Sequence, residues 1–250
     1  MGMPLDGLTL EEAVQRVAGG LEAGRGGVVL TPNLDVLRQY RHSPRLRQVF
    51  DDTELLVADG VPLVWASRLQ GSPLPQRITG SDMLWSVAAV AAERGDLLFL
   101  AGGRPGVPQR AGDRLARVLP GLRTLAQECY VEPGPLAPQV ESLVNAVVAA
   151  APRLVYVGLP FASQVELIGE LRERLPATWF LGIGSCFDFV NGDRPRAPVW
   201  LQRIGLEWAH RLVHEPRVWR RYLVQGLPFA AQLGLHSLRV RATRRHAPPT

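Results

Sequence analysis

Short apolar runs alternate along most of the chain with longer segments in which apolar residues recur every three or four positions. The short runs predict buried strands. They cover residues 26–30, 54–58, 96–103, 153–159 and 178–184, and a further strand is expected near 123–128. Helical spacing covers residues 62–69, 81–95, 107–119, 135–151 and 163–175, and a capping box of Thr9 with Glu12 begins an earlier helix. The alternation predicts an α/β fold with one parallel sheet and helices on both faces.

Polar and glycine residues gather where these predicted strands end. They are Thr31, Asn33, Asp59, Gly60, Gly102, Gly103, Gln164, Ser185 and Asp188. Ligands of parallel sheets bind beyond the carboxyl ends of the strands. The pattern therefore favours a ligand-binding domain over an inert one. Either Asn33 or Asp35 can cap the helix that follows the first strand.

Asp59 ends the run Leu-Val-Ala-Asp-Gly and has two interpretations. It can cap the helix that begins near Pro62, since proline is favoured in the first turn of a helix. It can instead be a general base at the end of a strand, where burial raises the pKa of a carboxyl group. The residues alone leave both interpretations open.

Two further segments could bind an anion. The glycine turn at 100–106 follows a strand and precedes a helix, an arrangement that lets backbone N–H groups approach a phosphate or simply makes a tight turn. Arg77, Thr79 and Asp82 lie in Pro-Gln-Arg-Ile-Thr-Gly-Ser-Asp. This segment is either an anion clamp leading into a helix or a loop with an ordinary cap.

Composition adds little to the fold but limits the compartment. The 250 residues are 46% hydrophobic, contain two cysteines and show neither an apparent signal peptide nor a transmembrane run. We therefore expect a protein that stays inside the cell, with both thiols reduced. His, Cys, Asp and Glu show no metal-ligand spacing and no Asp-x-Asp occurs, so neither a metal nor a cofactor is expected.

Charge is distributed unevenly. Residues 1–193 carry 17 arginines and 21 acidic residues, whereas 194–250 carry 11 arginines and two acidic residues, Glu207 and Glu215. Lysine is absent. The basic terminus predicts an anionic partner: a membrane surface, a nucleic acid or a phosphorylated substrate. From about residue 196 the chain is helical, aromatic and arginine-rich, which predicts a C-terminal appendage (196–250) on an α/β domain (1–195), with a poorly ordered tail.

Several motifs occur in the order of a known family. They are Thr-Pro-Asn (31–33), Ala-Asp-Gly (58–60), Trp-Ala-Ser (65–67), the segment 75–82, Gly-Ser-Cys-Phe-Asp (184–188), Arg-Ala-Pro-Val-Trp (196–200), Gly-Leu-Glu-Trp-Ala-His-Arg-Leu (205–212) and 215–223. Over residues 8–230 the chain resembles the WecG/TagA/CpsF family of bacterial glycosyltransferases. The resemblance implies a Rossmann-like core with a membrane-docking helical appendage. It also implies inverting transfer of a sugar from a UDP-sugar to a membrane-bound polyprenyl-diphosphate sugar.

The resemblance also assigns roles to residues of this chain. Asp59 matches the family's catalytic base, and Arg77 matches the arginine before its Thr-Gly-x-Asp. The substrate-binding residues that it implies are Thr31, Asn33, Gln164 and the appendage arginines Arg211, Arg217, Arg220 and Arg221. The chain departs from the family at Ser163, Val165, Ser185 and Cys186, which leaves the identity of the sugar open.

Three functions follow as hypotheses. The first is a metal-independent glycosyltransferase, cytoplasmic and peripherally bound to the inner face of the membrane, with a homo-oligomer left open. The second is a nucleic-acid-binding protein whose arginines alternate with Trp208, Trp219 and Tyr222. The apolar residues Leu201, Ile204, Leu212 and Val213 suit a membrane or a core better, so no nucleic-acid partner is expected. The third is a relative that binds a nucleotide sugar without turnover.

Overall fold

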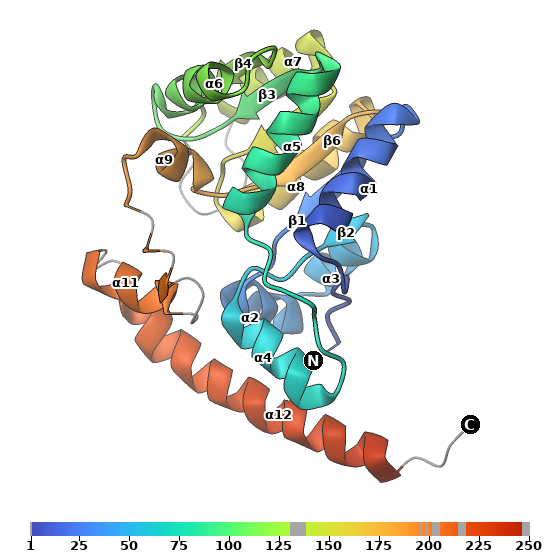
Figure 1. Cartoon of the computed structure of the whole chain (residues 1–250), viewed down its shortest axis with the longest axis vertical. Helices are drawn as coiled ribbons and strands as arrows, with labels where there is room; N and C mark the ends of the chain where they lie inside the picture. Colours follow the sequence, from blue (N-terminus) through green and yellow to red (C-terminus); the bar gives the residue numbers. More distant parts are fainter. Residues whose placement is uncertain are drawn as a thin grey trace.

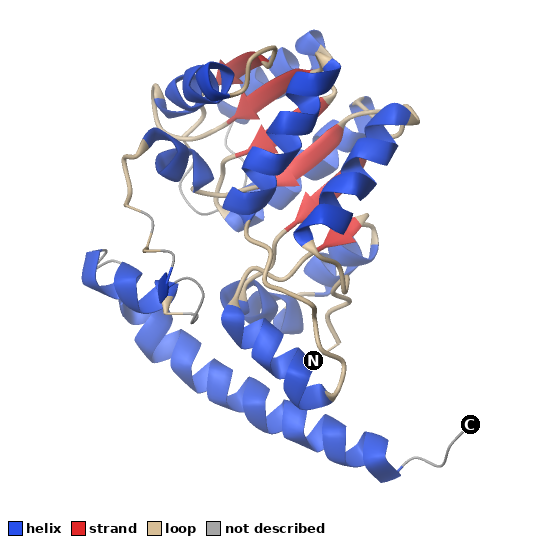
Figure 2. Ribbon diagram, viewed as in Figure 1, coloured by secondary structure: helices blue, strands red, loops and turns tan. Residues whose placement is uncertain are grey.

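Six parallel strands form one sheet at the centre of the molecule (Figures 1 and 2). The computed structural model describes residues 2–130, 139–195, 197–198, 200–201, 206–214 and 219–246. The strand order is β2-β1-β6-β5-β3-β4, and every pair is parallel. The predicted α/β class with a parallel sheet is confirmed.

Each strand lies within a segment predicted as a strand, although β4, at the edge of the sheet, is neither apolar throughout nor buried. The strands are β1 (Gly27–Leu30), β2 (Leu55–Leu56), β3 (Leu97–Ala101), β4 (Arg123–Gln127), β5 (Leu154–Val157) and β6 (Trp179–Gly182). Strands β1, β5 and β6 have four residues each, and all of these residues are buried, as expected for strands covered on both faces.

Helices cover both faces of the sheet because alternate strand residues point to opposite sides. One apolar cluster joins Val29, Leu98 and Tyr156 to helices α1 (Leu10–Glu22), α5 (Gly80–Arg94), α6 (Val107–Val118) and α9 (Cys186–Asn191). The other joins their neighbours Val28, Phe99 and Val155 to α2 (Leu34–His42), α3 (Pro44–Asp51), α7 (Gln139–Ala150) and α8 (Phe161–Arg174). Figure 1 shows α1 and α5 in front of the sheet and α8 behind it.

The helices predicted from local sequence patterns are present in the structure. Thr9 and Glu12 form the expected capping box at α1. The helices predicted at 81–95, 107–119 and 163–175 are α5, α6 and α8, and the described part of 135–151 is α7. Helices α3 and α9 were not predicted from the apolar pattern, because both are short. Both cysteines are free and buried, and burial raises the pKa of Cys129.

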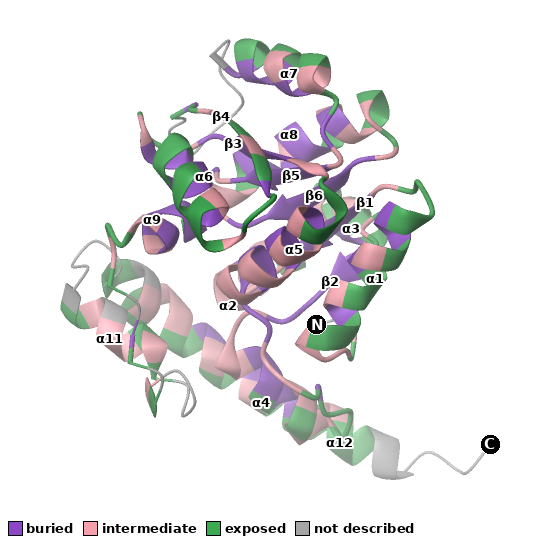
Figure 3. Cartoon of the chain, turned by 45° about the horizontal axis from the view of Figure 1, so that its top comes forward, coloured by how far each residue is buried: buried purple, intermediate pink, exposed green. Residues whose placement is uncertain are grey.

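The C-terminal helices pack below the carboxyl ends of the strands (Figure 1). They are α11 (Glu207–His214), the π-helix η2 (Arg220–Gly226) and α12 (Leu227–His246). Helix α12 lies alongside α4 (Val61–Gln70), which the sequence predicted at 62–69. In Figure 3 buried positions of α12 lie where it passes α4. No helix of the described ranges is both long enough and apolar enough to span a bilayer.

Helix α12 is held by apolar and polar contacts together. Phe229 and Leu233 are buried in the same cluster as α2. Gln70 Nε2 donates to Ser237 Oγ at 3.0 Å, and Arg41 donates to Gln232 Oε1 at 2.9 Å. The appendage is thus helical as predicted and docks on α2 and α4. The domain boundary between residues 195 and 196 stays a prediction, and the predicted disordered tail lies outside the described residues from 247 onward.

Candidate functional site

Three sequence-distant segments meet at the carboxyl ends of β1 and β2. The N–H of Asp59 donates to the carbonyl of Pro32 at 2.9 Å, and the N–H of Ile78 donates to the carbonyl of Ala58 at 3.0 Å. The segments 31–33, 58–60 and 77–80 therefore form one continuous layer. This layer brings together four residues singled out in the sequence: Thr31, Asn33, Asp59 and Arg77.

The layer is closed on one side by the start of α9. A methyl group added at Gly80 would lie 3.4 Å from Thr31 Oγ1 and 3.3 Å from Cys186 Sγ. The Ser81 hydroxyl also lies 3.4 Å from that sulfur. Cys186, a departure from the family pattern, is therefore a packing residue beneath the N-terminus of α5.

Two predicted binding residues cap helices. Asn33 Oδ1 accepts from the N–H groups of Asp35 and Val36 at 3.0 and 3.2 Å, so Asn33 rather than Asp35 caps α2. Thr79 caps α5 and forms a reciprocal capping box with Asp82. These bonds satisfy N–H groups that would otherwise be orphaned at helix starts. Their direct contact with a substrate stays a prediction.

Asp59 is half-buried and stands one residue before the N-cap of α4. The N-cap position of α4 belongs to Gly60, with Pro62 in the first turn as expected. The capping interpretation of Asp59 is therefore not supported by the position of the helix start. A methyl group at Gly60 would come within 3.8 Å of Asn33 Cα, so the Asp-Gly pair lies directly against the Thr-Pro-Asn segment.

Gln164 supports the turn that follows β6. Its side chain is buried at the start of α8, and its Oε1 accepts from the N–H of Gly184 at 3.1 Å. Its amide nitrogen packs so closely on Gly182 that a Cβ there would clash. Ser163 and Val165, where the chain departs from the family, are also buried. Gln164 thus positions the backbone leading to Ser185, which is exposed, while its predicted contact with substrate stays a prediction.

A second charged cluster surrounds Asp188. Its carboxylate is about one-tenth exposed and bonds Arg104 at 2.9 Å and Arg194 at 3.2 Å. The hydrogen bond and the negative charge of Asp188 raise the pKa of Arg104. Asp188 therefore holds two arginines at this end of the sheet, a role that the sequence did not predict. The sequence feature that could have pointed to Arg104 is its position directly after Gly102 and Gly103, at the end of a predicted strand.

The glycine turn at 100–106 contains residues with positive φ, a backbone conformation that favours glycine. Gly102 and Gly103 have φ of 87° and 103°, values that other residues rarely adopt. The N–H of Gly106, at the start of α6, already donates to the Glu128 carboxylate at 2.6 Å. One N–H at the start of α6 is therefore already paired with a carboxylate, and phosphate binding by Gly102 and Gly103 stays a prediction.

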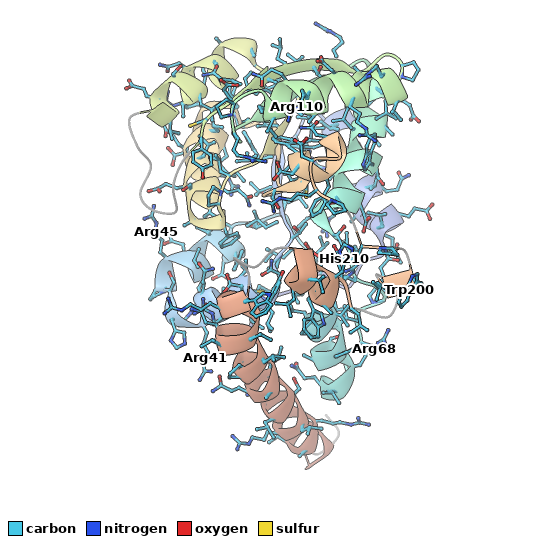
Figure 4. All side chains as sticks on the ribbon, turned by 90° about the vertical axis from the view of Figure 1, so that its left-hand side faces the viewer. Arg41, Arg45, Arg68, Arg110, Trp200 and His210 are labelled. Carbon is cyan, nitrogen blue, oxygen red and sulfur yellow. The ribbon has the colours of Figure 1, made fainter. Side chains whose placement is uncertain are left out.

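Arg77 connects the layer to the C-terminal helices. Its Nη1 donates to Glu207 Oε2 at 2.9 Å, across 130 residues of sequence. Figure 4 views the molecule from this side, with His210 marking α11 and Arg110 marking α6 above it. Arg220 lies in η2 and is exposed. The predicted roles of Arg211, Arg217 and Arg221 fall on side chains outside those that the structure describes.

Two cavities are described, and neither is lined by residues of this layer. One of about 180 Å³ opens between the N-terminal segment, α2, α4 and α12, with Leu37, Leu63 and Leu233 among its walls. Another of about 160 Å³ lies against α6 beside Arg110, Arg114 and Arg117. Within the described residues, no group of three or more His, Cys, Asp or Glu side chains is arranged to hold a metal ion. The candidate site is therefore the layer built around Asp59 and Arg77, both of which are half-buried.

Comparison with known proteins gives a consistent result. The profile of the glycosyl transferase WecG/TagA/CpsF family matches residues 1–244. A protein of Bacillus spizizenii (strain ATCC 23059 / NRRL B-14472 / W23), named N-acetylglucosaminyldiphosphoundecaprenol N-acetyl-beta-D-mannosaminyltransferase, is 29% identical over 204 residues, covering 81% of this chain and 77% of that protein. A protein of the same name from Bacillus subtilis (strain 168) is 27% identical over 199 residues, covering 79% and 75%.

Proposed function

Because the chain belongs to the WecG/TagA/CpsF family of glycosyl transferases, we propose that it transfers a hexose from a UDP-sugar to a polyprenyl-diphosphate-linked acceptor, with inversion. The names of the two Bacillus relatives support a lipid-diphosphate acceptor and an N-acetylmannosamine-like sugar. Products of this kind serve cell-surface polysaccharide synthesis. The observation that carries the proposal is the convergence of Asp59 and Arg77 in one layer at the strand ends.

In this proposal Asp59 is the general base. Its carboxylate takes the proton from the acceptor hydroxyl as that oxygen attacks the anomeric carbon of the donor sugar. The bond from the anomeric carbon to the diphosphate breaks on the opposite face, and UDP leaves. A positioned base contributes roughly 10²–10⁴-fold to such a step. The backbone bond from Asp59 to Pro32 supports this role, because it fixes the residue relative to the layer.

Arg77 is proposed to bind the diphosphate and to stabilise the charge on departing UDP. The positive N-terminal ends of α2 and α5 also point at the layer, but each already carries an acidic residue in its first turn, Asp35 and Asp82. These carboxylates offset part of the helix dipoles. The negative charge of the diphosphate is therefore balanced mainly by arginine side chains. Among the described residues, Arg77 is the arginine at the centre of the layer.

We further propose that the C-terminal helices bring the enzyme to the membrane face that holds its acceptor. These helices and the described residues just before them expose many large apolar side chains: Trp200, Leu206, Trp208, Val213, Trp219, Leu223, Val224, Leu227, Leu235 and Leu238. Eleven arginines lie in the same part of the sequence, from residue 194 onward. Exposed apolar groups beside arginines suit the interface of an anionic bilayer.

The test is UDP release by the full-length protein. A panel of UDP-sugars is supplied with a lipid-diphosphate N-acetylglucosamine analogue, and UDP and the glycosylated lipid are quantified. Acceptor-dependent release from at least one donor supports the proposal. Tight UDP binding without release from any donor would instead indicate a nucleotide-sugar-binding relative. A protein that neither binds UDP nor releases it would refute both.

A further inference from the structure

The ion pair between Arg77 and Glu207 differs from the other ion pairs of the described residues. Its side chains are 18% and 22% exposed, and no other described pair has both partners less than a quarter exposed. Solvent screens the attraction between two partly buried charges less than that between two charges on the surface. The side chains of Arg77 and Glu207 are therefore held more firmly in their paired positions. Arg77 is also the arginine to which the proposed function assigns the diphosphate.

The two partners are anchored differently. Arg77 precedes Ile78, which is buried and donates its N–H to the carbonyl next to Asp59. The backbone of Arg77 is thus joined directly to a residue that is anchored in the core. Glu207 is the first residue of α11, whose positive N-terminal end favours a carboxylate at that position. The pair therefore joins a rigid part of the site to the start of a C-terminal helix.

A carboxylate so near a diphosphate site would repel the ligand if it acted alone. Through Arg77 it has the opposite effect. An arginine side chain has many rotamers, and a ligand that must order them binds more weakly. Glu207 uses an Nη1 donor of a guanidinium that carries five N–H groups. Further donors thus remain to meet a phosphate from a guanidinium that is already oriented.

We propose that Glu207 is a positioning residue for the donor diphosphate: it holds Arg77 in its binding orientation and fixes the start of α11 beside the site. This inference rests on the proposed function, since it needs Arg77 to bind the donor. It makes α11 part of the donor site through a described contact. The alternative is that Glu207 competes with the diphosphate for Arg77. Removing Glu207 would then tighten UDP binding, whereas our proposal predicts weaker binding.

The experiment measures UDP affinity by calorimetry in a double-mutant cycle of the full-length protein. Glu207→Ala should weaken UDP binding by roughly three- to tenfold, the cost of ordering one long side chain and less than the loss expected for Arg77→Ala. In an Arg77→Ala background the same change should alter affinity by less than about twofold, because its effect passes through Arg77. Glu207→Gln should restore part of the loss, since the amide oxygen still accepts a hydrogen bond.

The controls separate the possible failures. Glu170→Ala removes the carboxylate of a half-exposed ion pair with Arg174 on α8 and should leave affinity unchanged. Circular dichroism and thermal unfolding of each variant check the fold, and Glu207→Gln carries the test if Glu207→Ala unfolds. Unchanged or tighter UDP binding by a folded Glu207 variant would overturn the inference, as would an equal loss in both Arg77 backgrounds. If the wild-type protein does not bind UDP, the proposed function itself falls, and this inference with it.

Discussion

The backbone N–H of Asp59 lies 2.9 Å from the carbonyl oxygen of Pro32 and donates to it. This bond continues the pairing of β1 and β2 past the end of both strands, following the bond from Val57 to Leu30. It places the Asp-Gly segment beside the Thr-Pro-Asn segment. The backbone that carries the Asp59 carboxylate therefore has a defined position at the strand ends.

Replacing Asp59 with asparagine should lower turnover by roughly 10²–10⁴-fold, because the side chain keeps its shape but loses its basicity. UDP affinity and thermal stability should stay close to those of the wild type. Initial rates of UDP release and calorimetric titration measure the two effects. Asp113→Asn, an exposed change on α6, is the matched control. Wild-type rates for Asp59→Asn would show that the base is another residue.

Arg77→Ala should weaken UDP binding and turnover together. Charge-assisted hydrogen bonds contribute about 1.5–3 kcal/mol, or roughly ten- to a hundredfold in affinity. Arg123→Ala, at an exposed position at the start of β4, removes the same charge away from the site and should have little effect. Equal behaviour of the two variants would remove Arg77 from the donor site.

Treatment with EDTA should leave turnover nearly unchanged. The prediction follows from the sequence, which lacks Asp-x-Asp and metal-ligand spacings, and from the arginines proposed to balance the diphosphate. Activity is compared before chelation, after chelation and after adding Mg²⁺ or Mn²⁺ back. A loss on chelation that either ion restores would contradict metal independence.

The double variant Leu235→Gln and Leu238→Gln should reduce sedimentation with anionic liposomes by about tenfold, since apolar area entering a bilayer contributes roughly 25 cal/mol per Å². Both leucines are exposed on α12, so folding and UDP affinity should be preserved. Val118→Gln makes a comparable change on α6, outside the C-terminal helices, and should sediment like the wild type. Equal sedimentation of all three proteins would exclude α12 from membrane binding.

Tyr156→Phe should lower the free energy of unfolding by about 0.5–1.5 kcal/mol, because the fully buried hydroxyl donates to the Leu84 carbonyl at 2.7 Å. Burial raises the pKa of Tyr156 well above its ordinary value of 10.0. The folded state thus resists an ionisation that the unfolded chain undergoes. The contribution of Tyr156 to the free energy of unfolding is therefore fully present below about pH 10 and is lost as the pH rises above it. Urea unfolding between about pH 8 and 11 should show a smaller alkaline loss for Tyr156→Phe, with the exposed Tyr130→Phe behaving like the wild type. Parallel pH profiles for Tyr156→Phe and the wild type would contradict this account.

The sequence by itself determined the strands, most helices and the edge of the sheet at which the polar residues gather. These features depend on interactions within a few residues, such as the capping boxes of Thr9 with Glu12 and Thr79 with Asp82. Burial on both faces also leaves a local signal, because a strand covered on both sides must be apolar throughout. The place of Asp59 at a strand end could therefore be predicted from the pattern of residues around it.

Only the tertiary structure decided which of these residues meet and what they touch. Asp188 holds Arg104 and Arg194, Gln164 supports Gly184, and Arg77 pairs with Glu207 across 130 residues. Charged and amide side chains of this kind can serve many partners, so the sequence leaves their choice open. The strand order and the docking of α12 on α4 bring particular pairs within hydrogen-bonding distance. Partner choice is thus a property of packing between distant segments, about which local propensity carries no information.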